Sequence, residues 1–179
     1  MIFVTVGTNG AAFDRLLSEL DDIAPGEEVV VQRGPSRFAP TGSSCFDYLP
    51  FAEIDRLVGE ARVVITHGGV GSTLVAIAAG HRPIVVPRLR AFGEAVDDHQ
   101  LLFAQRLDRD GLVRCIAEPA DVRAEVAAGP TRLPAPLQHA GPSSLVVELA
   151  EYIERRCLTR ESESIAAAVH ERRAASTPL

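Results

Sequence analysis

The sequence predicts an α/β fold, a Rossmann-like and mostly parallel sheet with helices on both faces. Short β-branched or apolar runs alternate with helix-like segments over the first 128 residues, the pattern of strands joined by crossover helices. The first of these runs, Ile2–Val6, is apolar enough to be a buried strand. The run Val63–Thr66 ends in a glycine-rich turn with an apolar helix-like segment directly behind it, an order by which α/β proteins hold phosphate.

Turn residues and apolar spacing place the elements in order. A Pro25-Gly26 turn precedes the second strand, Gly80 stops one helix, and Pro87 ends the strand after it. Strands are predicted at Ile2–Val6, Glu28–Gln32, Ser44–Tyr48, Val63–Thr66, Pro83–Val86 and Val113–Ile116. Helices are predicted at Ala12–Ile23, with Phe13, Leu16, Leu17 and Leu20 on one face, and at Phe51–Glu60, Ser72–Ala79, Asp97–Arg109 and Ala120–Ala127.

The end of the chain differs in composition from the part before it. Residues 129–142 contain four prolines and two glycines, which predicts an extended linker. Residues 143–158 return to helical spacing, and residues 159–179 form a polar tail that is either a lone helix or disordered. The predicted organisation is a Rossmann-like domain at 1–128, the linker, a C-terminal helix and the tail.

Composition excludes several classes of protein. The chain has 179 residues with a net charge of −6, which disfavours nonspecific binding to nucleic acid. All 18 basic residues are arginine, so lysine chemistry, including a P-loop lysine, is excluded. Cys45, Cys115 and Cys157 form no CxxC pair, which predicts no disulfide framework or zinc site and favours a reducing cytoplasm. No apolar run approaches the roughly 20 residues of a membrane span.

The first candidate site is the turn after the strand at 63–66, where the free N–H groups of a helix N-terminus suit a phosphate. Glycines let the backbone approach an anion, and a histidine at the carboxyl end of a strand is able to donate to a phosphate oxygen. The candidate residues are His67, Gly68, Gly69, Gly71, Ser72 and Thr73. A turn that needs glycine only for packing, with a half-buried histidine, remains an alternative.

Two further segments follow predicted strands. Gly7 and Thr8 end the first strand, where an ordinary turn is the alternative. A loop-to-helix junction carries adjacent donors and acceptors suited to sugar hydroxyls, namely Glu94, Asp98, His99 and Gln100. All three segments are expected to meet beyond the carboxyl ends of the strands.

Two simpler interpretations of the loop-to-helix junction stay open. One aspartate, Asp97 or Asp98, suffices as a helix cap. A metal site made of Asp97, Asp98 and His99 is disfavoured, because consecutive residues rarely point to one centre. Arg88 and Arg90 flank this segment; they are suited to an acidic ligand group but are expected to be exposed.

Three motifs stand in one order: Thr66–Thr73 (THGGVGST), Gly80–Pro87 (GHRPIVVP) and Asp98-His99-Gln100. Together they resemble the donor-binding half of GT-B glycosyltransferases, in particular the C-terminal domain of glycosyltransferase family 28. Phe3–Thr8 resembles the start of single-domain members, which are the soluble subunit of the eukaryotic lipid-linked GlcNAc transferase and the bacterial PssE-type exopolysaccharide subunits. Pro87-Arg88 and Phe92-Gly93-Glu94 are similar to the PssE type. The resemblance covers about residues 2 to 116.

This resemblance implies a nucleotide-sugar-binding domain at 1–128 whose donor is a UDP-sugar, a substrate, with no cofactor and no metal. The glycine turn, with Gly7 and Thr8, is expected to hold the diphosphate, and His67 to be catalytic by stabilising the leaving group. Glu94 and the Asp98-His99-Gln100 motif are expected near the donor sugar. Val75 stands where many family members carry a ribose-binding glutamate.

The resemblance also implies a partner. Single-domain members work with a membrane-associated, PssD-like subunit that presents a lipid-linked saccharide acceptor, and the general base commonly comes from that half. The expected function is therefore the catalytic subunit of a two-component inverting glycosyltransferase of polysaccharide biosynthesis, cytoplasmic and recruited to the inner membrane face. A non-catalytic nucleotide-sugar-binding or enhancer subunit, and a sugar-nucleotide epimerase of the GT-B fold, are the alternatives.

Overall fold

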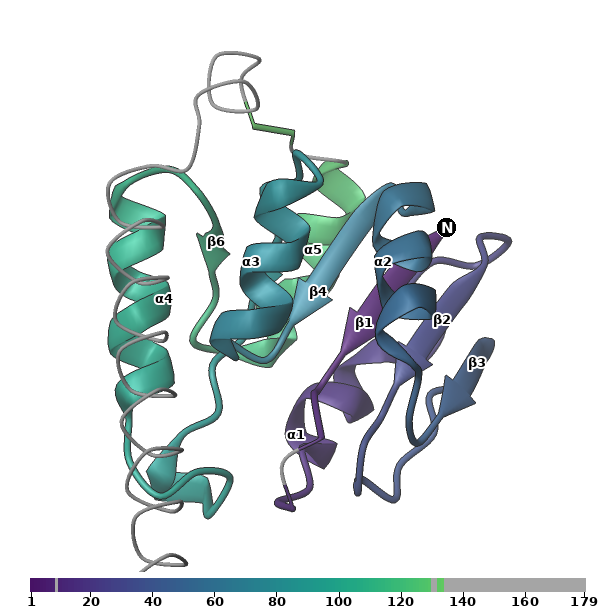
Figure 1. Cartoon of the computed structure of the whole chain (residues 1–179). Helices are drawn as coiled ribbons and strands as arrows, with labels where there is room; N and C mark the ends of the chain where they lie inside the picture. Colours follow the sequence, from purple (N-terminus) through teal and green to yellow (C-terminus); the bar gives the residue numbers. More distant parts are fainter. Residues whose placement is uncertain (9, 130–131, 134–179) are drawn as a thin grey trace, which may run out of the picture. The chain divides into compact units, whose positions relative to one another are not determined.

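The computed structural model describes residues 1–8, 10–129 and 132–133. Within them, six parallel strands form one sheet in the order β3-β2-β1-β4-β5-β6 (Figure 1). The strands are β1 (Ile2–Thr5), β2 (Val29–Gln32), β3 (Ser43–Phe46), β4 (Val63–Thr66), β5 (Ile84–Val85) and β6 (Arg114–Cys115). The predicted fold class is confirmed, and the strand order reverses direction between β1 and β4, where ligands of such sheets bind.

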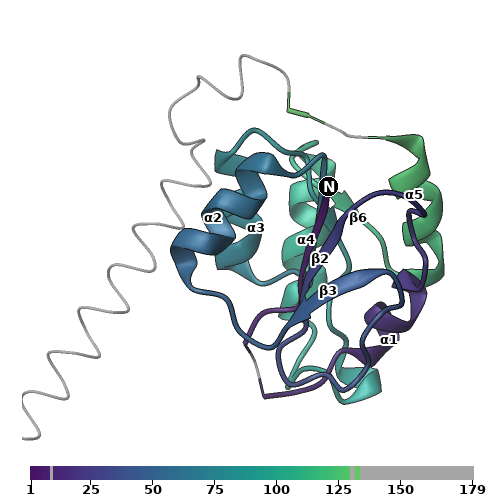
Figure 2. The ribbon, with the colours of Figure 1, turned by 90° about the vertical axis from the view of Figure 1, so that its right-hand side faces the viewer.

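Helices cover both faces of this sheet (Figures 1 and 2). They are α1 (Asp14–Leu17), α2 (Phe51–Glu60), α3 (Val70–Ala78), α4 (His99–Arg109) and α5 (Val122–Ala128), with short 3-10 turns at Ser18–Leu20, Arg90–Phe92 and Pro119–Asp121. No helix among the described residues is both long enough and apolar enough to span a membrane.

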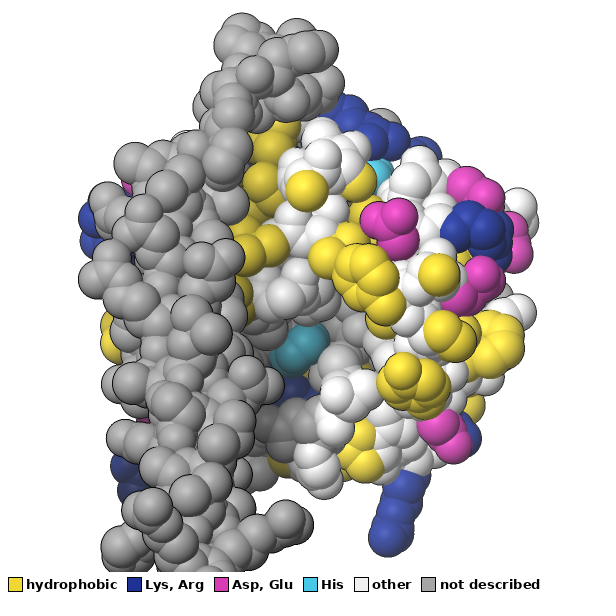
Figure 3. All heavy atoms as spheres, viewed as in Figure 1, with side chains coloured by type: hydrophobic (Ala, Val, Ile, Leu, Met, Phe, Trp, Pro, Cys, Tyr) yellow, Lys and Arg dark blue, Asp and Glu magenta, His cyan; other side chains and the backbone are white. Residues whose placement is uncertain are grey.

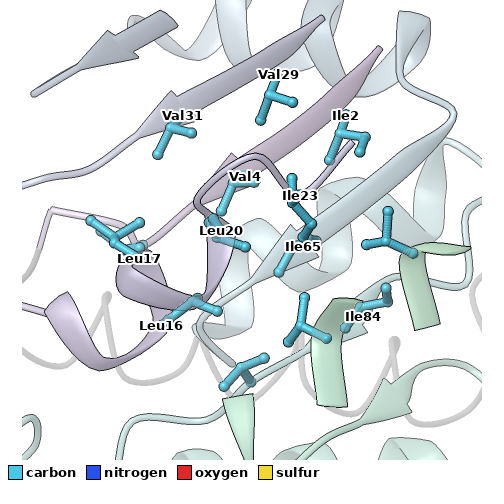
Figure 4. Packing of buried hydrophobic residues seen from close by; sticks show 14 of the residues in the cluster. Ile2, Val4, Leu16, Leu17, Leu20, Ile23, Val29, Val31, Ile65 and Ile84 are labelled. Carbon is cyan, nitrogen blue, oxygen red and sulfur yellow. The ribbon is translucent and has the colours of Figure 1, made fainter. Parts of the chain in front are cut away.

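Alternation along the strands divides the core into two layers, because successive side chains of a strand point to opposite faces. Ile2 and Val4 of β1 face α1 and α5, within the larger apolar cluster (Figure 4). Phe3, between them, packs on the other face with Leu57 of α2 and Ala76 of α3. Both faces of the central strands are thus buried, as the composition of β1 and β4 predicts.

The predicted bounds of α2 and β4 agree with the structure, but the helix predicted at Ala12–Ile23 is much shorter. α1 ends at Leu17, a 3-10 turn follows, and Asp21 then adopts an extended backbone (φ −55°, ψ 121°). The physical reason is tertiary. The Asp21 carboxylate accepts the Thr41 N–H (2.7 Å), which draws the chain out of the helix toward the segment before β3.

The predicted C-terminal elements lie almost wholly outside the described residues. These are the linker at 129–142, the helix at 143–158 and the tail at 159–179, and they stay predictions. Three linker residues are described: the Gly129 N–H donates to the Val126 carbonyl (3.2 Å), Arg132 forms an isolated bridge with His81, and the Leu133 N–H donates to the Gly80 carbonyl (3.0 Å).

A cluster of ion pairs lies at the amino ends of the central strands. Glu27 binds both guanidinium nitrogens of Arg62 that face it (2.9 and 2.6 Å) and the amino group of Met1 (3.1 Å). The hydrogen bond from Arg62 outweighs the effect of burial and lowers the pKa of Glu27 to about 2. This cluster anchors the start of β1 to the start of β4.

We expect Glu27→Gln to lower the free energy of unfolding by about 1 kcal/mol at pH 7, since the cluster is partly exposed. The Glu27 pKa is depressed on folding, so the carboxylate contributes fully above its unfolded pKa of about 4.5 and progressively less as the pH falls toward about 2. Urea unfolding at pH 7, 4.5 and 3 measures the difference between variant and wild type. A difference that stays constant from pH 7 to pH 3 would contradict this assignment.

Candidate functional site

A hollow of about 430 Å³ opens beyond the carboxyl ends of β1, β2 and β4. It lies where the strand order reverses, and its far side is formed by the segment before α2 and by α2 and α3. Figure 3 shows a histidine side chain within a hollow of this face. The lining residues are Thr5, Gly7, Thr8, Gln32, Tyr48, Leu49, Phe51, Ile54, His67, Gly69, Gly71, Ser72 and Val75.

A second hollow of about 400 Å³ lies against β6 and α5. Its lining carries three carboxylates, Glu118, Asp121 and Glu125, against one arginine, Arg114, which is itself paired with Glu125 (2.8 Å). This acidic lining disfavours a phosphate. The hollow at the carboxyl edge of β1, β2 and β4 is therefore the candidate site for an anionic ligand.

The His67 side chain is held between two glycine backbones. A Cβ added at Gly7 would lie 2.5 Å from His67 Cε1, and one added at Gly69 would lie 2.3 Å from Nε2. The ring therefore fits only because neither neighbour has a side chain. Gly7 and Gly68 also take φ values of +72° and +80°, a backbone region that glycine enters without strain.

Burial and hydrogen bonding fix the charge state of His67. Nδ1 lies 3.3 Å from the Thr5 carbonyl, which only accepts, so this nitrogen donates its hydrogen. Burial, together with the charge of Arg88, lowers the pKa of His67 to about 4, against the opposing effect of the Thr5 carbonyl. The imidazole is therefore neutral at pH 7, and its Nε2 is a lone-pair acceptor.

The N-terminus of α3 borders the same hollow. Gly69 is the N-cap residue, and its carbonyl accepts the Thr73 N–H (3.1 Å). The N–H groups of Val70, Gly71 and Ser72 have no carbonyl four residues earlier within the helix, so they are suited to an anion. Gly71 and Ser72 line the hollow, so the structure places this end of the helix dipole beside the cavity.

The structure brings together most of the residues predicted for a phosphate. Six of them line the hollow: Gly7, Thr8, His67, Gly69, Gly71 and Ser72. The other two support it from behind. Gly68, with φ +80°, lies beside Gln100 at the back of the turn, and the buried Thr73 hydroxyl pairs with that of Thr66 (3.2 Å).

The residues predicted for the donor sugar do not line this hollow, and three of them are engaged elsewhere. Glu94 is buried and forms a two-pronged ion pair with Arg15 (2.9 Å for each oxygen). Asp98 accepts the Arg90 N–H (2.9 Å), and the Gln100 side-chain carbonyl accepts the Arg88 N–H (3.3 Å). Their role toward a sugar stays a prediction.

The remaining member of the junction, His99, is exposed and contacts the Asp97 carboxylate through Nδ1. Asp97 also accepts the backbone N–H of His99 (3.0 Å), so it is Asp97 rather than Asp98 that satisfies the start of α4. In the part of the chain that the structure describes, no group of three metal-binding side chains comes together.

Sequence reasoning missed two features of the site. The first is an apolar wall formed by Tyr48, Leu49, Phe51, Ile54 and Val75. Its signal was present, because β3 ends at Phe46 and the aromatic residues that follow belong to the loop before α2 and to its first residue. The prediction of a strand at Ser44–Tyr48 assigned Tyr48 to the sheet and not to the loop that lines the hollow.

The second missed feature is Arg88, which was expected to be exposed and is fully buried. Its guanidinium donates to the backbone carbonyls of Val6 (2.9 Å), Ala11 (2.8 Å) and Ala12 (3.0 Å). Arginine is rarely buried without partners. Here the partners are backbone carbonyls of the segment 6–12, which is distant in sequence. The sequence around residue 88 therefore does not indicate that Arg88 is buried.

Comparisons with known proteins identify the family of this domain and its fold. Residues 1–126 match the family model of the glycosyltransferase family 28 C-terminal domain. No sequence among curated proteins matches the chain. Among solved structures, the glycotransferase of kitacinnamycin is similar with a TM-score of 0.53 and 20% identity, over 96% of this chain and 42% of that one.

Two other glycosyltransferase structures resemble the chain to the same extent. CalG4, the calicheamicin glycosyltransferase, gives a TM-score of 0.53 and 22% identity over 86% of this chain and 43% of its own. The spinosyn rhamnosyltransferase SpnG, complexed with spinosyn aglycone, gives a TM-score of 0.51 and 18% identity over 90% of this chain and 44% of its own. These likenesses show the fold, and this chain spans less than half the length of each of the three proteins.

We expect Gly69→Ala to destabilise the fold by about 1–3 kcal/mol, the usual cost of overpacking, because the new Cβ would overlap the His67 ring. The backbone of Gly69 (φ −67°) accepts any residue, so the cost should shrink when His67→Ala is added. Urea unfolding of the four proteins of this cycle measures the coupling.

Gly71→Ala is the matched control, since nothing lies within 4 Å of a Cβ added there. It should leave the free energy of unfolding nearly unchanged. An equal cost of Gly69→Ala with and without His67 would show that the histidine does not limit this position.

Proposed function

Since the chain belongs to glycosyltransferase family 28, with residues 1–126 forming its C-terminal, nucleotide-sugar donor-binding domain, we propose that it binds a UDP-sugar in the hollow beyond β1, β2 and β4. One observation carries this proposal: the turn at His67–Ser72, the Gly7-Thr8 turn and the N-terminus of α3 line a single cavity. The UDP-sugar is a substrate, and the proposal involves no cofactor and no metal.

The diphosphate is proposed to lie against the glycine turn. Gly71 has open space above it and Gly69 has only the imidazole, so a phosphate is able to approach the first turn of α3. The N–H groups there point along the positive end of the helix dipole. Ser72 adds a hydroxyl that lines the hollow. In the free protein this hydroxyl donates to the Gly69 carbonyl (3.2 Å).

The nucleoside is proposed to lie against the apolar wall. Tyr48 and Phe51 are both 66% exposed and border the hollow, so a planar base has aromatic side chains on which to stack. Val75 lines the same cavity and offers no carboxylate for a ribose. Any polar contact to the ribose would therefore come from other lining groups, among which Thr5, Thr8, Gln32 and Ser72 have polar side chains.

The reaction that suits this site is direct, inverting displacement. An acceptor hydroxyl attacks the anomeric carbon, the bond to the diphosphate breaks, and negative charge grows on the leaving diphosphate. Fixed N–H donors of the α3 N-terminus stabilise that charge without rearrangement. His67 lines the same hollow and is the proposed catalytic residue: its neutral ring packs against Gly7 and Gly69 and so holds both turns in place beside the diphosphate. The base that accepts the proton of the acceptor comes from outside this domain.

We also propose that transfer requires a partner subunit, a membrane-associated and PssD-like chain that presents a lipid-linked saccharide at the inner membrane face. One observation supports this. At and after the carboxyl ends of β3 and β5, large apolar side chains are exposed, namely Phe46, Tyr48, Phe51, Phe92, Val96 and Leu102.

We expect millimolar UDP to raise the melting temperature, because a ligand that binds only the folded state stabilises it by mass action. Gly71→Val should abolish the shift, since its side chain would occupy the space over the first turn of α3. Gly59→Val is the control, because it is also a helical glycine with open space but lies away from the hollow. No shift with UDP, TDP or GDP in the wild-type protein would refute nucleotide binding at this site.

We expect the chain alone to transfer no sugar from a UDP-sugar to a lipid-linked acceptor, and to do so when co-expressed with its membrane-associated partner. His67→Ala in the complex should lower the transfer rate by up to about 10²-fold, because the ring fixes the turns that present N–H donors to the diphosphate, and a small misplacement of such groups is costly. If the complex of the His67→Ala variant transfers at the wild-type rate, this chain is an enhancer of the partner and not the catalytic subunit.

A further inference from the structure

The candidate diphosphate site has no cationic side chain on its surface. Among the described residues that line the hollow, none is arginine, and the chain has no lysine. His67 is neutral at pH 7, because its pKa is lowered to about 4. A nucleoside diphosphate brings two or three negative charges, and an uncompensated charge in a partly buried site is costly. A positive charge behind the surface would therefore add to the stabilisation that the N–H groups of the α3 N-terminus give such a ligand.

Arg88 lies directly behind it. The side chain is fully buried, and its three hydrogen bonds go to the carbonyls of Val6, Ala11 and Ala12. Val6 precedes Gly7 and Thr8, which line the hollow, so Arg88 holds both ends of the loop that contributes them. The guanidinium carbon also lies 4.8 Å from the centre of the Phe13 ring, and the charge is close enough to lower the pKa of His67.

Among the described residues, no carboxylate forms an ion pair with Arg88, whose guanidinium donates to backbone carbonyls. Glu94 acts on Arg88 electrostatically, but its oxygens are bound by Arg15 (2.9 Å each) and by the Leu89 N–H (3.0 Å). The two arginines and one glutamate leave one net positive charge. Arg88 Nε also has no hydrogen-bond partner in the described structure. A guanidinium stays protonated in such a place, and a charge in a dry interior acts over a longer range than one in water.

We propose that Arg88 is the positioning residue of the donor site: it supplies the fixed positive charge felt by the diphosphate and holds the 6–12 loop that carries Gly7 and Thr8. The inference rests on the proposed function and adds to it the residue that selects for ligand charge. Arg88 touches no ligand. Its charge acts through the neutral His67 ring and the loop, so that affinity rises with the number of phosphates.

The test is the binding of uridine, UMP and UDP by calorimetry to wild type, Arg88→Gln, Arg88→Lys and Arg62→Gln. Arg62→Gln removes the same charge at the opposite, amino edge of the sheet and should leave the three affinities unchanged, although it lowers the free energy of unfolding. A unit charge acting over about 10 Å at an effective dielectric constant of about 20 changes affinity by about tenfold. Arg88→Gln should therefore weaken UDP about tenfold or more, UMP less and uridine little, whereas Arg88→Lys should keep the wild-type ratio of UDP to uridine affinity within a few-fold.

Equal weakening of uridine and UDP in Arg88→Gln, or unchanged UDP affinity, overturns the inference while the proposed function stands. Failure of the wild-type protein to bind UDP overturns both. If Arg88→Gln does not fold, the folded Arg88→Lys decides, and a tenfold loss in its ratio of UDP to uridine affinity overturns the inference. A readout without ligand completes the test. NMR titration should show a higher His67 pKa in Arg88→Gln than in Arg62→Gln, and an unchanged His67 pKa overturns the placement of the charge.

Discussion

The carboxyl edge of this sheet depends on one close contact, the His67 ring between the backbones of Gly7 and Gly69. The contact joins the loop after β1 to the turn after β4, the two strands at which the strand order reverses. Gly34, in the loop after β2, packs against Gly7 in the same way, because a Cβ there would lie 2.5 Å from the Gly7 carbonyl oxygen. Loops from three neighbouring strands are thereby packed so tightly that side chains are excluded, and the space in front of them is left for a ligand.

A second set of interactions holds the segment between β5 and α4. Arg15 of α1 binds Glu94 and also donates to the Pro87 carbonyl (3.1 Å), while its guanidinium lies 4.6 Å from the centre of the Phe92 ring. Arg88 connects the same segment to the end of β1. In the free protein, polar residues of the segment predicted to bind sugar therefore fasten loops from opposite halves of the sheet. This gives them a structural role whatever further role a donor sugar assigns them.

These two sets of contacts separate the groups that face a ligand from the charged groups that hold the site together. The surface that faces a ligand is made of glycine backbone, hydroxyl groups, a neutral imidazole and apolar side chains. The charged groups stand behind that surface and fix its shape. A preorganised arrangement of this kind loses little energy to reorganisation when charge develops in front of it.

The sequence by itself determined the sheet, its order of elements and the glycine turns, because these depend on local pattern. Apolar runs such as Val63–Thr66 form strands wherever both faces are covered, and glycine is required where φ is positive, as at Gly7 and Gly68. Only the tertiary structure decided the length of α1, the burial of Arg88 and the apolar wall from Tyr48 to Val75. Each of these depends on partners far along the chain: the Thr41 N–H for Asp21, the carbonyls of residues 6, 11 and 12 for Arg88, and Val75 of α3, which lines the same hollow as Tyr48. Long-range hydrogen bonds and burial outweigh local propensity, and a short window of sequence does not show which distant groups will supply them.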